Sequence, residues 1–167
     1  MTVQAQILAL LERLQRELGM AIVIITHDLG VVAELADEIA VMYAGRIVET
    51  ASTEVLFSAP EHPYTWGLLN SIPTLEGPRE AALVPIPGTP PSLVNRPSGC
   101  HFHPRCAYAQ PEHARIDPLL QDVPGDPGHQ AACLLAADVR GRLWAELRAG
   151  RTPQQALANA GSSGVPS

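Results

Sequence analysis

The chain has 167 residues, enough for one domain with a hydrophobic core but not for two full domains. Seventeen acidic and eleven basic residues give a net charge of −6, and no basic block could neutralise a run of phosphates, so nucleic-acid binding is disfavoured. All eleven basic residues are arginine, which excludes a phosphate-binding loop of the form G-x-x-x-x-G-K-[ST], because its lysine must reach the β- and γ-phosphates.

Proline divides the chain. It is absent from residues 1–59 and then occurs fourteen times between Pro60 and Pro127. We therefore predict three regions, namely an α/β domain over 1–59, a Pro-rich and mostly irregular extension over 60–150, and a disordered tail over 151–167. No apolar run approaches the roughly 20 residues of a spanning helix, and the N-terminus does not resemble a secretory signal, so we expect a cytoplasmic protein.

The first region alternates between helical and strand patterns. Apolar side chains recur every three or four residues over 3–18, which predicts an amphipathic helix. Residues 21–25 are continuously apolar and β-branched, which suits a strand of a parallel sheet that is covered on both faces. A helix at 29–36, a strand at 39–43, a tight turn at Ala44–Arg46 and a strand at 47–49 follow. This order predicts a layered α/β domain with too few strands to be complete.

The second region is punctuated by proline. Short helices are expected at 54–58 and 64–71, and residues 75–97 are expected to be extended and partly polyproline. A final helix after Cys133 is expected to be interrupted near Gly141.

His27 and Asp28 follow the predicted buried strand directly, in AIVIITHDLG. Ligands of parallel α/β sheets bind beyond the carboxyl ends of the strands, where an imidazole could contact a phosphate. Alternatively, His27 lies in an ordinary strand-to-helix turn, with Asp28 capping the helix that starts at Leu29. The spacing alone leaves both interpretations open.

The run IVIITHDLGVVAELADEIAVMYAGRIVE resembles the C-terminal end of the ATP-binding subunit of ABC importers for oligopeptides and dipeptides. HPYTWGLLNSIP and PGTPPSL resemble the extension typical of these importers, and the resemblance covers residues 1 to about 135. It implies part of a P-loop NTPase-like layered sheet, ATP and Mg²⁺ as cofactors, and a role for His27 as the switch histidine that contacts the γ-phosphate. The implied partners are membrane permease subunits and a second ATP-binding subunit, at the cytoplasmic face of the membrane.

Family members carry a phosphate-binding loop, a signature motif and a catalytic glutamate before the residues seen here. We therefore expect a truncated chain or a misplaced start, and a chain that neither binds ATP tightly nor hydrolyses it alone. Two alternatives are a noncatalytic metal-binding regulatory module and a nonfunctional gene remnant.

Three cysteines follow the spacing C-x5-C-x26-C, and because the paired C-x2-C is missing, chance and a loose zinc site remain equally open. The segment GCHFHPRCAYA resembles a pattern whose four cysteines hold an iron–sulfur cluster in some members of the family. Here His113 occupies the third position. The resemblance thus implies a site of Cys100, Cys106, His113 and Cys133 that holds a [4Fe–4S] cluster or zinc and clamps the extension. His101 and His103 are expected at the surface or in a supporting position.

Overall fold

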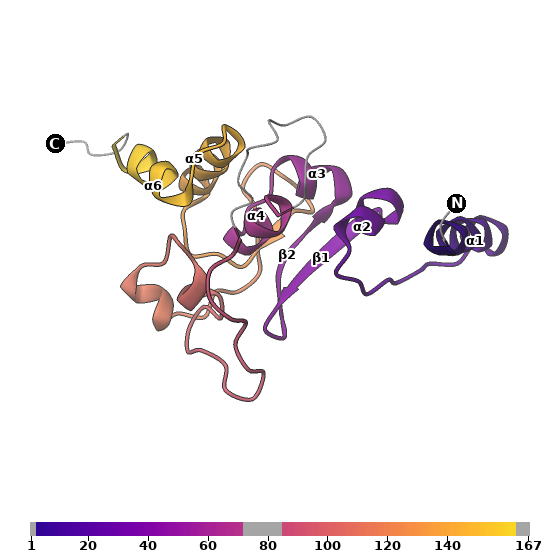
Figure 1. The fold of residues 1–167 in the computed structure, drawn as a ribbon, viewed down its shortest axis with the longest axis horizontal. Coiled ribbons are helices and arrows are strands. Elements are labelled where there is room, and N and C mark those ends of the chain that lie inside the picture. The colour runs from indigo at the N-terminus through magenta and orange to yellow at the C-terminus, as the bar shows by residue number, and fades with distance from the viewer. Residues whose placement is uncertain (1–2, 72–84, 163–167) are drawn as a thin grey trace. The chain divides into compact units, whose positions relative to one another are not determined.

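The computed structural model describes residues 3–71 and 85–162, and the chain divides into two compact units between Asp37 and Glu38 (Figure 1). Each unit is described by itself. Within the described residues, no helix is both long and apolar enough to cross a membrane. The predicted α/β class is confirmed, because helices accompany a small sheet.

The first unit contains two helices. Helix α1 (Val3–Leu18) follows the predicted range and ends at Gly19, whose φ of 63° places it in the left-handed region that favours glycine. Helix α2 (Leu29–Leu35) is shorter than predicted by one residue.

The strand predicted at 21–25 does not form in the described residues, and this expectation was wrong. Val23 is 90% and Ile25 97% exposed. A strand that is apolar on both faces requires hydrogen-bonding neighbours and covering layers, and this segment has no ladder partner among the described strands. Local sequence preference therefore does not suffice to make a strand here.

The second unit is built on a four-stranded antiparallel sheet in the order β1-β2-β4-β3. Strands β1 (Glu38–Tyr43) and β2 (Arg46–Ser52) confirm the two predicted strands, while β3 (Gln121–Asp122) and β4 (Gln130–Ala131) were not predicted. The hairpin turn has positive φ at Ala44 and Gly45, 47° and 77°, as a type I′ turn requires. The parallel, P-loop-like layering expected from the sequence is not seen in the described part of the chain.

Short helices follow the hairpin. Helix α3 (Thr53–Ser58) is capped by the Ser52 hydroxyl, which accepts the Val55 N–H. Helix α4 (Pro63–Leu69) starts at the HPY motif: Pro63 occupies the first turn, and His62 Nδ1 accepts the Tyr64 N–H at 3.1 Å. Two 3₁₀ turns, η1 (His103–Arg105) and η2 (Pro111–Ala114), lie further along the chain.

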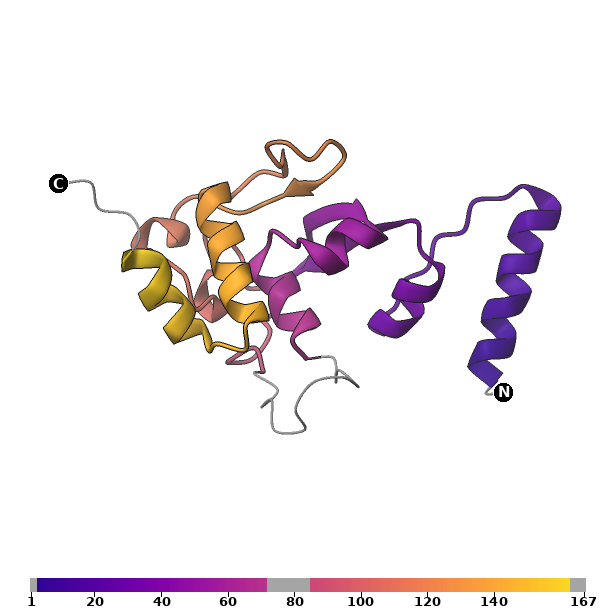
Figure 2. The same cartoon turned by 90° about the horizontal axis from the view of Figure 1, so that it is seen from above.

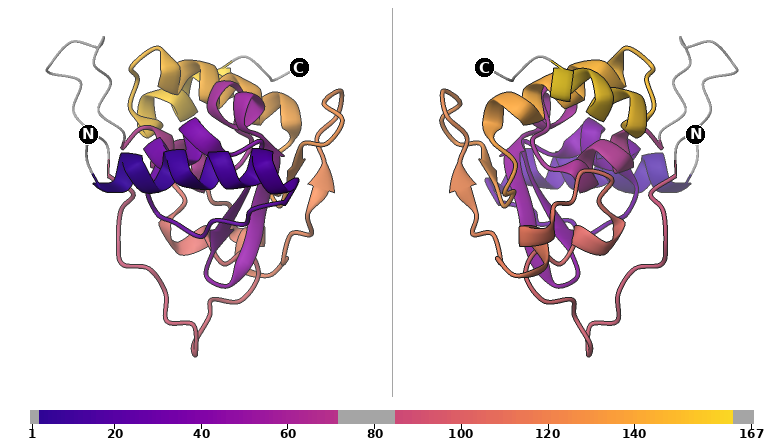
Figure 3. Two further views of the ribbon diagram at one scale, coloured as in Figure 1. Left: turned by 90° about the vertical axis from the view of Figure 1, so that its right-hand side faces the viewer. Right: turned by 90° about the vertical axis from the view of Figure 1, so that its left-hand side faces the viewer.

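Residues 85–98 form neither helix nor strand, in keeping with the expected irregular extension, and run as a long loop in Figure 3. Arg105 holds this loop, because its guanidinium donates to the carbonyls of Pro87 at 2.7 Å and Ile86 at 3.2 Å. Residues 75–84 of the expected polyproline stretch lie outside the described residues.

Helices α5 (Ala137–Arg148) and α6 (Pro153–Ser162) lie side by side (Figure 2). The interruption expected at Gly141 does not occur, because Leu143 and Leu147 are buried in the core and hold the helix together. Disorder was expected from residue 151, yet α6 forms. Thr152 and Gln155 cap it reciprocally, and Ala156 is fully buried. Residues 163–167 of the expected tail lie outside the described residues.

The core of the second unit joins α4, α5 and α6. Its buried members are Trp66, Tyr108, Leu135, Leu143, Leu147 and Ala156. Cys106 and Cys133 pack against this cluster, so two predicted metal ligands belong to the edge of the hydrophobic core.

Candidate functional site

His27 lies at an exposed bend in the first unit. Asp28 accepts the N–H groups of Gly30 at 2.9 Å and Val31 at 3.3 Å, and so caps α2, while its own N–H donates to Thr26. The capping role foreseen for Asp28 is confirmed. The role of His27 toward a phosphate stays a prediction.

A small cavity of about 10 Å³ in the second unit brings the four predicted metal ligands together. Cys100, Cys106, His113 and Cys133 all line it, together with His62 and His103 among others. By volume it has room for roughly one water molecule. Sequence positions up to 33 residues apart thus converge, although the spacing C-x5-C-x26-C suggested no such convergence.

Backbone contacts set this arrangement. The Cys100 N–H donates to the His113 carbonyl at 2.9 Å, and the Cys106 N–H donates to the His103 carbonyl at 3.3 Å. The Ala132 N–H donates to the Val48 carbonyl at 2.8 Å, which fixes the chain just before Cys133 on the edge of β2.

Gly99 allows the loop that carries Cys100 to approach the loop that carries His113. Its φ is 64°, and a Cβ at this position would stand 2.5 Å from the His113 carbonyl oxygen. Only glycine combines this backbone conformation with so close a contact. The G-C pair of the sequence therefore marks the place where two loops touch.

All three sulfur atoms accept hydrogen bonds from the backbone. Cys100 accepts from Phe102 and His103, Cys106 from Tyr108, and Cys133 from Leu135. In each case the backbone N–H two residues ahead favours the thiolate and lowers the pKa of the thiol.

Burial opposes ionisation of the thiols. It raises the pKa of Cys106 to about 12 and that of Cys133 to about 11, and it also raises the pKa of Cys100. Neighbouring cysteines add to the rise of the pKa for Cys106 and Cys133, whereas Asp117 adds to it for Cys100. The thiols are therefore protonated at neutral pH in this arrangement.

Among the described residues, no group of three or more His, Cys, Asp or Glu side chains is arranged so that it could hold a metal ion. The cavity gathers the predicted ligands without placing them in coordination geometry. The metal site of Cys100, Cys106, His113 and Cys133 stays a prediction.

A larger hollow of about 410 Å³ adjoins the cavity. It is lined by the tip of the β1–β2 hairpin, by residues 117–120 and by His101, and it shares His62, Cys100 and Phe102 with the cavity. An ion pair between Arg46 and Asp117 at 2.6 Å stands on its wall.

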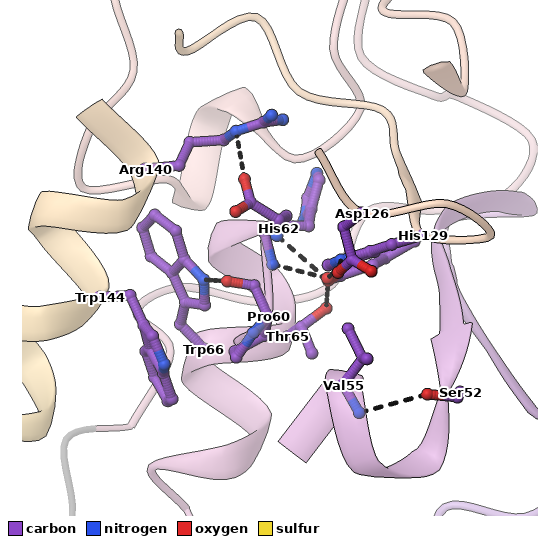
Figure 4. A network of polar contacts seen from close by, with 12 residues as sticks. Ser52, Val55, Pro60, His62, Thr65, Trp66, Asp126, His129, Arg140 and Trp144 are labelled. Atoms are coloured by element: carbon purple, nitrogen blue, oxygen red, sulfur yellow. Dashed lines mark hydrogen bonds and ion pairs between the residues drawn. The ribbon is translucent and has the colours of Figure 1, made fainter. Parts of the chain in front are cut away.

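Glu49 organises a polar network inside the second unit. Figure 4 shows its partners His62, Thr65 and His129. The Glu49 carboxylate is fully buried and accepts the N–H groups of Glu61 at 2.6 Å and His62 at 3.1 Å, and the Thr65 hydroxyl. His129 Nε2 lies 2.8 Å from the same carboxylate, and His129 Nδ1 lies 3.0 Å from Asp126. Strand β2, the start of α4 and the loop before β4 thus meet at one side chain.

Both ring nitrogens of His129 face carboxylates, which only accept hydrogen bonds. Burial opposes the charge of His129, but its hydrogen bonds to Glu49 and Asp126 outweigh burial and raise its pKa. His62 accepts a backbone N–H instead, and burial lowers its pKa to about 4. One histidine is thus held charged and the other neutral.

Arg140 completes the buried charges. Its Nε lies 2.6 Å from Glu61 Oε2 as an ion pair whose angles fall outside hydrogen-bond geometry. Its guanidinium also interacts with the Cys133 sulfur.

Glu49 was not predicted from the sequence, and the sequence around His62 and His129 carries no independent functional signal. The sequence does contain one indication of a buried carboxylate. Glu49 is a single acidic residue at the end of the apolar strand pattern RIVE.

Residues 48–112 match the model of a family described as "Oligopeptide/dipeptide transporter, C-terminal region". This segment is similar to that family. It begins in β2, contains the HPY motif, Cys100 and Cys106, and ends within η2. The resemblance recognised from the sequence is thereby confirmed.

Three curated relatives extend the comparison, each named oligopeptide transport ATP-binding protein OppD. The protein from Bacillus subtilis is 57% identical over 108 residues, which cover 65% of this chain and 30% of the relative. The protein from Haemophilus influenzae is 49% identical over 137 residues, 82% of this chain and 41% of the relative. The protein from Mycobacterium tuberculosis is 49% identical over 146 residues, 87% of this chain and 24% of the relative.

The chain therefore spans between 24% and 41% of the length of these relatives. The chain is similar to part of these longer oligopeptide transport ATP-binding proteins.

Proposed function

We propose that the chain is the C-terminal part of an ATP-binding subunit of a peptide importer, which couples ATP hydrolysis to transport through membrane permease subunits. The observation that carries this proposal is the match of residues 48–112 to the transporter C-terminal region, together with relatives named as oligopeptide transport ATP-binding proteins. ATP and Mg²⁺ are the cofactors of this function, and a second ATP-binding subunit is a partner. Its place is the cytoplasmic face of the membrane.

Within this function, His27 contacts the γ-phosphate of ATP and helps to position the attacking water. Two observations support the role. His27 is exposed, and the turn that carries it is held from both sides, by Thr26 and by the Asp28 cap of α2. A phosphate contact requires a reachable side chain on a fixed backbone.

Phosphoryl transfer also needs a lysine and a metal ion on the phosphates, and the chain has no lysine. The purified chain is therefore expected to show neither tight nucleotide binding nor ATP hydrolysis. Sustained phosphate release that follows the chain through purification would contradict this.

A chimera tests the positive part of the proposal. The matching segment of the Bacillus subtilis relative, 57% identical over 108 residues, is replaced by the segment of this chain. The chimera is expected to support ATP hydrolysis and peptide uptake with its permease partners. Stable expression and membrane assembly without peptide-dependent uptake would argue against the proposal.

His27→Ala in this chimera is expected to lower kcat for ATP hydrolysis by about 100-fold or more, since it removes a contact to the transferred phosphoryl group. Glu54→Gln on the exposed side of α3 serves as the control and is expected to leave kcat unchanged. An unchanged kcat in His27→Ala would refute the assigned role.

We also propose that the cysteine cavity holds a metal ion or cluster that clamps the extension. The convergence of the predicted ligands on one cavity and the N–H groups directed at all three sulfur atoms favour it. A clamp would add folding energy to residues 85–98, which form no regular structure. Anaerobic purification that yields neither visible cluster absorbance nor stoichiometric metal would refute the clamp.

A further inference from the structure

The larger hollow of the second unit combines an exposed apolar surface with a pair of opposite charges. Its volume of about 410 Å³ lies within the range of roughly 300–1,000 Å³ that is usual for sites of small ligands. Three of its lining side chains are large, apolar and between 43% and 69% exposed, and we call them the apolar patch: Met42, Ile47 and Leu119. A ligand that covers this patch with an apolar group removes it from water, which favours binding.

Arg46 and Asp117 supply the two charges. Arg46 Nη2 lies 2.6 Å from Asp117 Oδ2, although the residues are 71 positions apart in the sequence. Arg46 comes from the start of β2 and Asp117 from the loop of residues 117–120, so the tertiary fold makes this pair. The side chains are 50% and 40% exposed. An ion pair this exposed contributes little to stability, so a ligand can engage both charges without a large cost to the fold.

The pair leaves polar atoms available to a ligand. The contact between the two side chains uses one nitrogen and one oxygen. Arg46 Nε and Nη1 and Asp117 Oδ1 take part in no further hydrogen bond within residues 3–71 and 85–162. A guanidinium binds a carboxylate through parallel N–H groups, and a carboxylate accepts hydrogen bonds from an ammonium group. The pair thus offers neighbouring positions to one carboxylate and one ammonium group.

An α-amino acid carries these two groups in the matching arrangement. Its ammonium and carboxylate groups are attached to the same carbon and so stay next to each other, as the charges of Arg46 and Asp117 do. The side chain leaves that carbon in another direction and can cover the apolar patch. A dipeptide separates its terminal charges by a further residue, so only one of them can meet the pair closely.

We propose that this hollow binds a free α-amino acid with a large apolar side chain, such as leucine or methionine. Its carboxylate lies on Arg46, its ammonium group lies on Asp117, and its side chain covers the apolar patch. The inference is independent of the role proposed for His27, because every residue of the hollow lies in the second unit.

Isothermal titration calorimetry on the unaltered 167-residue chain tests the class of ligand. L-Leucine is expected to bind saturably. N-Acetyl-L-leucine lacks the ammonium group and L-leucinamide lacks the carboxylate, so each is expected to bind at least about ten-fold more weakly, as the loss of a charged hydrogen bond implies. L-Serine keeps both charges but cannot cover the apolar patch, and it is also expected to bind at least about ten-fold more weakly.

Variants test the residues. Arg46→Gln and Asp117→Asn are each expected to weaken binding of L-leucine at least about ten-fold. The matched controls are Arg142→Gln and Asp138→Asn, which break an exposed ion pair of α5 at 3.0 Å outside the hollow and are expected to leave the affinity unchanged. Leu119→Ser changes a side chain that is 69% exposed and is expected to weaken binding while the chain stays folded. Circular dichroism of each variant checks its fold before titration.

The results decide the inference whichever way they fall. If the unaltered chain shows no saturable binding of L-leucine up to about 10 mM, the hollow is no amino-acid site. Equal affinities for L-leucine and N-acetyl-L-leucine would refute the assignment of the ammonium group to Asp117. Tighter binding of L-leucyl-L-leucine than of L-leucine would overturn the amino-acid assignment in favour of a peptide. None of these results bears on ATP hydrolysis, which the chimera tests separately.

Discussion

Replacing Glu49 tests how the buried network holds the second unit together. The Glu49 carboxylate accepts two backbone N–H groups, the Thr65 hydroxyl and the ring of His129, all away from solvent. In Glu49→Leu, each neutral donor left without an acceptor costs about 1–3 kcal/mol. The imidazolium of His129 also loses a buried counter-charge, a loss of about 3–5 kcal/mol for typical buried pairs.

These contributions are not additive, but a total above about 5 kcal/mol would equal the whole stability of many domains. Glu49→Leu is therefore expected not to fold under native conditions. Glu49→Gln keeps one carbonyl oxygen and turns an amide NH₂ toward donors, so a loss of about 2–4 kcal/mol is expected.

Urea unfolding followed by tryptophan fluorescence measures the loss, because Trp66 and Trp144 both belong to the second unit. The control is Glu54→Gln, an exposed change of the same chemistry that is expected to stay within about 0.5 kcal/mol of the parent. If Glu49→Gln is as stable as that control, Glu49 does not organise the network, and the reasoning fails.

Three further predictions concern the same unit. Gly99→Ala is expected to lower the free energy of unfolding by more than about 2 kcal/mol, because positive φ and a close backbone contact both oppose a Cβ. Gly125→Ala has positive φ in open space and is expected to lower it by about 1 kcal/mol. Equal losses in urea unfolding would contradict this. The raised pKa of His129 implies stability that is fully present below about pH 6.5 and is lost as pH rises through the folded-state pKa. The midpoint of unfolding, measured over a series of pH values, is therefore expected to fall in that range. In His129→Gln this dependence of the midpoint on pH is expected to be weaker. Leu143→Ala, at a fully buried position, is expected to cost about 2–5 kcal/mol in thermal or urea unfolding, and a loss below about 1 kcal/mol would place Leu143 outside the core.

Local patterns predicted the elements that local interactions can stabilise. The helix at 3–18 has an amphipathic repeat, and the hairpin of β1 and β2 has a turn that matches its strands. Capping by Asp28 could be predicted for the same reason, because its side chain accepts hydrogen bonds from N–H groups only two and three residues further along the chain.

Non-local pairing decided the elements that were missed. Strands β3 and β4 have two residues each and exist because β4 pairs with β2 across about eighty residues of chain. The run at 21–25 shows the converse, because a strong strand preference without a partner produced no strand.

For the candidate site, the sequence by itself determined the ligand types, the recognised motifs and the absence of a lysine that could serve a phosphate-binding loop. The tertiary structure alone decided that Cys133 joins Cys100 and Cys106 at one cavity, and which nitrogen each histidine presents to it. The physical reason is that a ring's proton follows its hydrogen-bond partner, and that partner depends on how distant loops pack. Residue types thus follow from the sequence, whereas their protonation and convergence follow from the fold.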